Sequence, residues 1–214
     1  FTGNKPKFLN YKKKKRFHSH QAKLKKKNGS RIDVEISASP IILNNNDFNG
    51  SLISYKDITQ RKENENLHRV LYNISKSANS NITLQKLYNT IYEELNTVID
   101  ATNFHIALLD REKVKVVFAY FVDQKDELDK EIDRFDVSDT LANYNIKYGK
   151  SLLVDYQQIL KFANKGFIKI SKIGTLTEKT SWLGVPLKVG NQIIGSMAIV
   201  NYCNPGIYSK RDIY

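Results

Sequence analysis

Hydrophobic and polar positions in this chain follow recognisable periods, and the densest apolar runs lie near its end. Residues 182–189 and 192–200 are apolar at nearly every position, and the pair Gly190-Asn191 between them tolerates the positive φ angles of a tight hairpin turn. Strands wetted on one face would alternate, so both runs are expected to be covered on both faces. The pattern predicts two adjacent antiparallel strands at the centre of a sheet.

Three residues interrupt these two runs: Gly184, Pro186 and Gly195. A glycine inside a strand usually marks a bulge or a close approach by another backbone or a ligand. Proline has no N–H to donate to the sheet, so Pro186 is expected at a bulge or with its nitrogen directed away from the neighbouring strand. The three residues therefore predict local irregularities within the two strands, and the prediction of two strands is unchanged.

The first sixty residues carry a second β pattern. One segment alternates clearly and places Ile32, Val34 and Ile36 on the same face. Turn-forming residues at 27–30 and 44–50 separate it from its neighbours. The predicted strands are 17–25, 31–40 and 51–58. Their order along the chain predicts a three-strand antiparallel meander.

Residues 61–79 are charged around an apolar stripe with helical spacing. The stripe consists of Leu67, Leu71, Ile74 and Ala78. This 4-3-4 spacing is typical of a coiled-coil seam, and so short a helix is marginally stable alone, which favours pairing with a second copy. A helix that packs only on its own domain explains the stripe equally well.

The remaining elements are consistent with an α+β domain. Thr83 can cap a helix whose apolar positions continue to Ile99, and this helix is expected to cover one sheet face. The predicted elements that follow are strands at 103–109 and 114–122, a helix at 139–147 capped by Ser138 or Asp139, a strand at 151–154 and a helix at 156–164. Residues 167–179 are irregular, and the acidic segment 123–136 is expected to be exposed.

The end of the chain resembles a GAF domain, in which a W-x-G-x-P-L strand, a turn, an I-G strand and an aromatic-x3-Asp helix start close the sheet. The matching residues are Trp182, Gly184, Pro186, Leu187, Ile194, Gly195, Tyr208 and Asp212. The resemblance implies a central antiparallel sheet with helices on one face and a lid of loops and short helices on the other. It implies a GAF domain at 81–214 that lacks its last helix.

Residues 1–60 resemble the C-terminal part of a PAS domain, which carries a K-x-G-S turn and a strand ending in D-I-T-x-R. The matching residues are Lys27, Gly29, Ser30, Asp57, Ile58, Thr59 and Arg61. In that family the Asp and Arg couple the sheet to the helix that leaves it. The resemblance thus implies a signal-relay role for Asp57 and Arg61, with 61–80 as a signalling linker helix.

The net charge of +12 is a local feature of the chain, because residues 1–32 hold twelve Lys or Arg and no acid. The basic leader 1–16 is better explained as a solvated segment than as a site for nucleic acid or anionic membrane, since stacking aromatics do not recur along it. No apolar run has the length of a membrane span. The single cysteine, Cys203, excludes an internal disulfide and favours a reducing, cytoplasmic setting.

Catalytic motifs are absent from the sequence, which argues against an enzyme: it has no Gly-rich phosphate loop, H-E-x-x-H or nucleophile elbow. His18 and His20 have no third ligand nearby to complete a metal site. His105 lies inside an apolar strand, where it is either a core histidine or a group facing a ligand. The candidate pocket residues are Phe104, His105, Phe118, Tyr120, Tyr144 and Trp182.

Together these features predict a sensory fragment of a signal-transduction protein, such as a sensor histidine kinase or diguanylate cyclase, whose output domain lies outside this chain. The GAF domain would sense a small molecule, with ligand and cofactor unidentified, and relay the signal through a homodimeric linker helix. Two alternatives are a ligand-free GAF dimerisation scaffold and, less favoured, a nucleic-acid binder that uses the basic leader.

Overall fold

The computed structural model describes residues 17–42, 48–110, 115–127, 139–170 and 175–213. The chain divides into two compact units, Phe1–Arg69 and Val70–Tyr214. The division falls inside the helix α1 (Thr59–Ala78), which the sequence assigned as a linker between 61 and 80. The basic leader 1–16 lies outside the described residues.

The first unit contains the predicted meander, β1 (Phe17–Lys25), β2 (Arg31–Ile42) and β3 (Phe48–Asp57), as an antiparallel sheet with β2 in the centre. The turn between β1 and β2 needs Gly29, whose φ is +86°, and Asn28 Oδ1 accepts hydrogen bonds from both the N–H and the hydroxyl of Ser30. The three predicted strands and their meander order are therefore confirmed.

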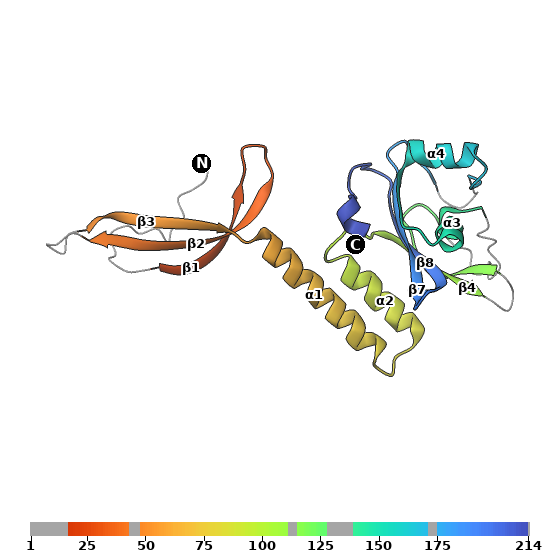
Figure 1. Ribbon diagram of the computed structural model, residues 1–214, viewed down its shortest axis with the longest axis horizontal. Helices are drawn as coiled ribbons and strands as arrows, with labels where there is room; N and C mark the ends of the chain where they lie inside the picture. The colour runs from red at the N-terminus through yellow and green to blue at the C-terminus, as the bar shows by residue number, and fades with distance from the viewer. Residues whose placement is uncertain (1–16, 43–47, 111–114, 128–138, 171–174, 214) are drawn as a thin grey trace. The chain divides into compact units, whose positions relative to one another are not determined.

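The second unit is built on a five-stranded antiparallel sheet with the order β5-β4-β8-β7-β6. Figure 1 labels its strands β4, β8 and β7. Its elements after α1 are α2 (Leu84–Leu95), β4 (Asn103–Asp110), β5 (Lys115–Val122), α3 (Leu141–Tyr148), β6 (Leu152–Asp155), α4 (Tyr156–Asn164), β7 (Ser181–Val189), β8 (Gln192–Asn201) and the short 3-10 helix η1 (Lys210–Ile213). The predicted α+β class, with β7 and β8 as adjacent inner strands, is confirmed.

The two faces of this sheet carry different layers. The helix α2 packs on one face, where it forms a hydrophobic cluster with Phe104, Ile106, Leu183 and Ile199. On the other face α3, α4 and the segment before β7 cover a cluster that contains Trp182, Ala198 and Val200, as Figure 1 shows for the helices. This is the predicted arrangement of a helical layer behind the sheet and a lid in front.

The N-cap of α2 agrees with the prediction from the sequence, whereas that of α3 corrects it. Thr83 caps α2 as predicted, and its side chain accepts a hydrogen bond from the N–H of Lys86. The helix α3 starts later than expected, because Thr140, rather than Ser138 or Asp139, accepts the bond from the N–H of Asn143. Asp139 itself has a φ of +65°, outside the helical range.

Both strand glycines mark close approaches, as predicted. A Cβ on Gly195 would clash with the backbone carbonyl of Ala107 on β4, and one on Gly184 would clash with the ring of Trp182. The register between β7 and β8 also shifts next to Gly195, which leaves Ile194 as an extra residue.

Replacing Gly195 with alanine should destabilise the second unit by about 1–3 kcal/mol, because a backbone carbonyl cannot move aside as a flexible side chain can. Urea unfolding followed by the fluorescence of Trp182, the single tryptophan, measures this loss. Gly206 provides the matched control, since a Cβ there meets only Asn204 Oδ1 at an ordinary 3.8 Å. Equal stability of the two alanine variants would contradict the close approach.

Candidate functional site

A cavity of about 120 Å³ lies in the second unit between the sheet and its lid. The sheet face of the cavity is formed by His105, Phe118, Phe121, Trp182, Val200 and the following Tyr202. The lid face comes from Leu141 and Ala142 of α3, Ile159 of α4, and Ile168 and Leu176 of the connecting segment. The cavity thus has a rigid floor of strands and a roof of short helices and loops.

Three of the six candidate pocket residues, His105, Phe118 and Trp182, line this cavity. Tyr144 belongs to the lid instead, where its ring contacts those of Tyr148 and Phe162. It therefore packs the roof together and does not border the cavity.

Phe104 and Tyr120 lie on the opposite face of the sheet, which corrects their expected place in the cavity wall. Tyr120 contacts Tyr88 and Tyr92 of α2, and Phe104 borders a separate hollow of about 80 Å³ on the α2 side. Phe104 and its neighbour His105 cannot share a face, because successive side chains in a strand alternate.

A β-bulge separates Phe118 from Tyr120. Ile106 pairs with Tyr120, but the next residue of β4, Ala107, pairs with Phe118, so that Ala119 is an extra residue. Without the bulge, Phe118 and Tyr120 would lie on the same face. The bulge directs Phe118 into the cavity and Tyr120 towards α2.

The His105 ring lies among aromatic side chains. Its centroid is 5.3 Å from that of Phe118 in an edge-on arrangement, 6.3 Å from Phe121 in a stacked one and 6.4 Å from Trp182. Desolvation in this apolar setting lowers the pKa of His105 from 6.5 to about 4. Within the described part of the chain, neither ring nitrogen has a hydrogen-bond partner. His105 therefore presents a neutral imidazole to the cavity.

This low pKa predicts a pH dependence of stability. Between pH 6.5 and about 4 the unfolded chain binds a proton at His105 that the folded chain does not, so stability from this group is complete above pH 6.5 and falls as the pH drops to 4. The loss should approach about 3 kcal/mol in all. Urea unfolding at pH 7.5 and 4.5 should show a smaller loss of stability for His105→Leu than for the parent; equal losses would contradict the neutral imidazole.

Two carboxylates border the cavity in the loop after β5, and both are already hydrogen-bonded. Asp123 accepts a 2.7 Å hydrogen bond from the Tyr202 hydroxyl. Burial of Tyr202 is the larger cause, and this hydrogen bond to a carboxylate the smaller one, that raises the pKa of Tyr202. Asp126 accepts bonds from both the N–H and the hydroxyl of Thr175, at 2.7 and 2.9 Å.

The Asp126–Thr175 contact fastens the lid segment to the loop after β5. Lys169 adds a second fastening, since its Nζ lies 2.9 Å from Asp139 Oδ2 and its N–H donates to the Asp139 carbonyl. These pairs could not be predicted from the sequence, because 49 residues separate Asp126 from Thr175 and an acidic loop is expected to be exposed.

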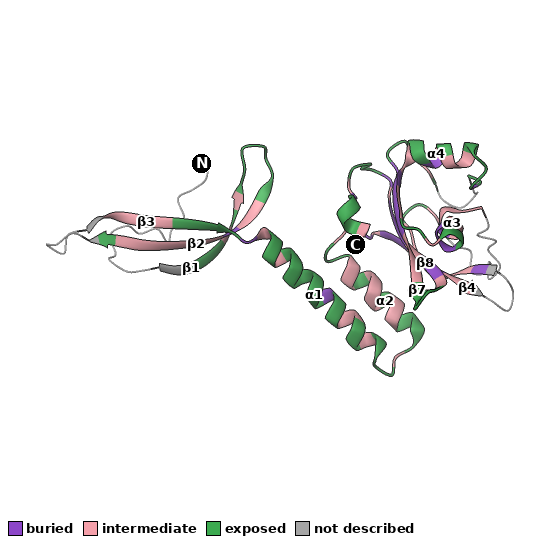
Figure 2. Ribbon diagram, in the orientation of Figure 1, coloured by how far each residue is buried: buried purple, intermediate pink, exposed green. Residues whose placement is uncertain are grey.

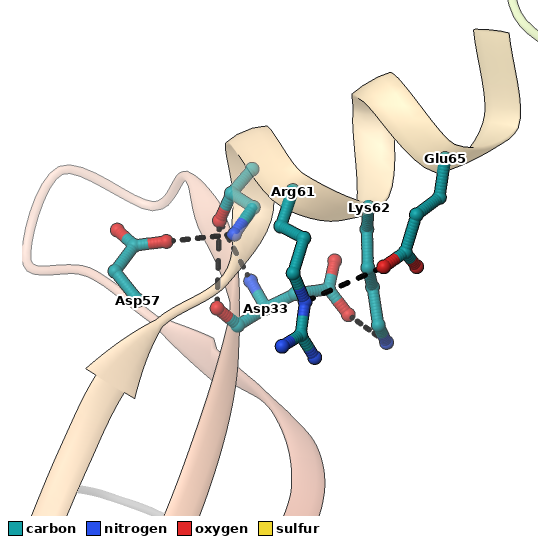
Figure 3. Close-up of polar contacts among 6 residues, drawn as sticks. Asp33, Asp57, Arg61, Lys62 and Glu65 are labelled. Atoms are coloured by element: carbon teal, nitrogen blue, oxygen red, sulfur yellow. Dashed lines mark hydrogen bonds and ion pairs between the residues drawn. The ribbon is translucent and has the colours of Figure 1, made fainter. Parts of the chain in front are cut away.

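A separate polar cluster joins the sheet of the first unit to the start of α1 (Figure 3). Asp57 Oδ1 accepts a 2.9 Å bond from the N–H of Thr59, and Thr59 Oγ1 accepts one from the N–H of Asp33 on β2. The pKa of Asp57 is lowered mainly by hydrogen bonding from the Thr59 side chain and, to a smaller extent, by hydrogen bonding from the Thr59 N–H. Asp57 thus fixes the point where the chain passes from strand to helix.

The cation of α1 that contacts the sheet is Lys62, whereas the resemblance to PAS domains implied that Arg61 couples the sheet to the helix. Lys62 Nζ lies 2.9 Å from Asp33 Oδ1, while Arg61 Nε lies 3.5 Å from Glu65 Oε1, one turn further along the same helix (Figure 3). Residues one apart on a helix point about 100° apart, so only one of the two can face β2.

The apolar stripe of α1 is only partly covered within this chain. Leu67 and Leu71 are 49% and 52% exposed, Ala78 is exposed and Ile74 is half-buried. The buried position of the helix is Val70, which the sequence placed beside the stripe. Most of the α1 ribbon in Figure 2 has the colour of exposed residues. The helix therefore turns Val70 inward and leaves the two leucines accessible.

Outside the cavity and the junction, the described residues form neither a metal site nor a membrane-spanning helix. Among the described residues, no group of three or more His, Cys, Asp or Glu side chains could hold a metal ion. No helix in the described ranges combines the length and apolarity needed to cross a bilayer.

Comparison with solved structures identifies the architecture of the second unit. The GAF domain of an Acinetobacter phosphoenolpyruvate-protein phosphotransferase aligns with a TM-score of 0.52 at 17% identity, over 70% of this chain and 82% of that one. The second unit has the GAF fold. The GAF domain of A. aeolicus nlh2 in an inactive state aligns over 70% of this chain and 85% of its own, with a TM-score of 0.47 at 16% identity.

Neither family models nor curated proteins match the sequence. At 17% identity the Acinetobacter domain shares a fold with this chain, and the residues of its cavity cannot be transferred to these positions.

Proposed function

We propose that the second unit is a small-molecule sensor domain and that the cavity between its sheet and lid is the ligand site. The observation that carries this proposal is the cavity itself, in which an unpaired imidazole faces an aromatic wall. Concave, mostly apolar sites with few polar groups are typical of small-molecule binding. His105, Phe118 and Trp182 would contact the ligand, and the protein would be regulatory rather than catalytic.

The lid supplies a route from binding to response. The Asp126–Thr175 and Asp139–Lys169 contacts hold the roof closed, and both residues of the first pair border the cavity. A ligand that displaces residues 167–170 and 175–180 would break these contacts, whereas one that fits beneath them would strengthen the contacts. Either change redistributes lid conformations without altering the sheet.

The relay in this proposal uses α1 as a dimer helix. Leu67 and Leu71 would pair with the same residues of a second copy, with Ile74 and Ala78 continuing the seam. The Asp57, Thr59, Asp33 and Lys62 contacts would pass a shift of this helix to a PAS-type sheet. The exposed thiol of Cys203 is compatible with a reducing, cytoplasmic setting.

Filling the cavity tests the sensor function. Ala142→Leu adds volume at a cavity-lining position of α3, while Ala163→Leu makes the same change on α4 at a half-buried position that does not line the cavity. Native mass spectrometry should find a co-purified small molecule on the parent and on Ala163→Leu, and none on Ala142→Leu. The same ligand content in both variants would reject the cavity as the site and leave a ligand-free dimerisation scaffold as the function.

A further inference from the structure

The polar groups around the cavity differ in whether they are already satisfied. Asp123 and Asp126 accept from Tyr202 and Thr175, and Lys169 pairs with Asp139. The remaining hydroxyls are also engaged: Thr177 N–H donates to Thr180 Oγ1, and Asn143 N–H donates to Thr140 Oγ1. His105 stands apart among the described lining residues, because its nitrogens have no protein partner.

The size of the cavity matches a ligand of about one ring. An engineered protein cavity of about 150 Å³ with apolar walls binds benzene. The present cavity, at about 120 Å³, is of this order and below the roughly 300 Å³ at which sites for drug-sized ligands begin. A nucleotide or a tetrapyrrole exceeds this volume.

The walls favour an uncharged aromatic ligand. Phe118, Phe121 and Trp182 offer ring faces and edges for stacked or edge-on contacts, which contribute beyond simple burial. An anion would lie near Asp123 and Asp126, and any charged group would lose its hydration in a mostly apolar space. A neutral ring carrying a single hydrogen-bonding group avoids both costs.

We infer that the cavity binds a single uncharged aromatic ring whose hydroxyl or ring N–H donates a hydrogen bond to the free nitrogen of His105. Phenol is the simplest member of this class. The neutral imidazole retains one acceptor nitrogen, and a hydrogen bond made where none existed before should favour phenol over benzene by about fivefold in Kd. This inference rests on the proposed sensor function.

Trp182 lines the cavity and is the single tryptophan of the chain, so its indole N–H gives one reporter resonance. Its ¹H–¹⁵N NMR resonance in the full chain is followed during titration with phenol, benzene, benzoate and tetramethylammonium. Phenol and benzene should shift it, with phenol binding about fivefold tighter, and the two ions should not. His105→Leu should keep benzene binding and remove the phenol preference, whereas His105→Gln, which retains an acceptor, should keep the preference.

Tyr120→Phe serves as the control, because it deletes a hydroxyl on the opposite face and should leave all four titrations unchanged. A phenol preference that persists in His105→Leu overturns the inference. Binding of benzoate or tetramethylammonium without phenol also overturns it but leaves the sensor function standing. If none of the probes binds and no small molecule co-purifies, the inference and the sensor function both fail.

Discussion

Replacing Phe104 with alanine should lower the free energy of unfolding of the second unit by about 3–5 kcal/mol. Phe104 is 1% exposed and packs against Tyr92 of α2 and Tyr120 of β5, with ring centroids 5.9 and 5.8 Å away. Its removal leaves a cavity between the sheet and α2 that neighbouring rings cannot fill. Urea unfolding of the full chain, monitored by Trp182 fluorescence at pH 7.5, measures the loss.

The adjacent residue provides the matched comparison. His105→Leu also removes an aromatic ring from β4, but the imidazole has no hydrogen-bond partner to lose. We therefore expect the free energy of unfolding to change by no more than about 1 kcal/mol at pH 7.5. Such a result would mean that Phe104 stabilises the fold, whereas His105 lines the cavity without stabilising the fold. A loss above 3 kcal/mol for His105→Leu, or below 1 kcal/mol for Phe104→Ala, would contradict this assignment of the two faces.

Changing Leu67 and Leu71 together to aspartate should weaken the proposed dimer about 100-fold. About half of each side chain is still exposed in one chain, so each should contribute roughly 0.8 kcal/mol on pairing, and the four in a symmetric dimer about 3 kcal/mol. Sedimentation equilibrium of the full chain over a range of concentrations measures the Kd.

Leu84→Asp is the control for the charge itself, because Leu84 is 67% exposed, lies at the start of α2 and is not a residue of the stripe. It should leave the dissociation constant within about twofold of the parent. If the double variant associates as tightly as the control, or if the parent is monomeric throughout, α1 does not act as a dimer helix and the relay must run by another route.

Local chemistry accounts for most of the elements that the sequence predicted. Alternation located β2, turn residues on either side of it located β1 and β3, and nearly continuous apolar runs around a turn located β7 and β8, with Gly190 at a φ of +59°. Thr83 capped α2 as expected. These features depend on residues within a few positions of each other, so their physical cause is contained in a short stretch of sequence.

Errors arose where a side chain's direction depended on its strand neighbours. The bulge at Ala119 reverses alternation between Phe118 and Tyr120, and nothing in residues 115–122 marks it, because the register is set by pairing with β4. The junction of the first unit shows the same limit: Lys62 and Arg61 are equally plausible cations in the sequence, and the position of Asp33 on β2 selects Lys62.

The sequence by itself determined the α+β class, the order of elements, the apolar stripe of α1 and the presence of a histidine in an apolar strand. Only the tertiary structure decided that His105, Phe118 and Trp182 share a cavity while Phe104 and Tyr120 do not, and that Asp126 and Thr175 fasten its lid. The physical reason is range: periodicity and capping act over a few residues, whereas a cavity is enclosed by side chains brought together from strands and loops far apart in the chain.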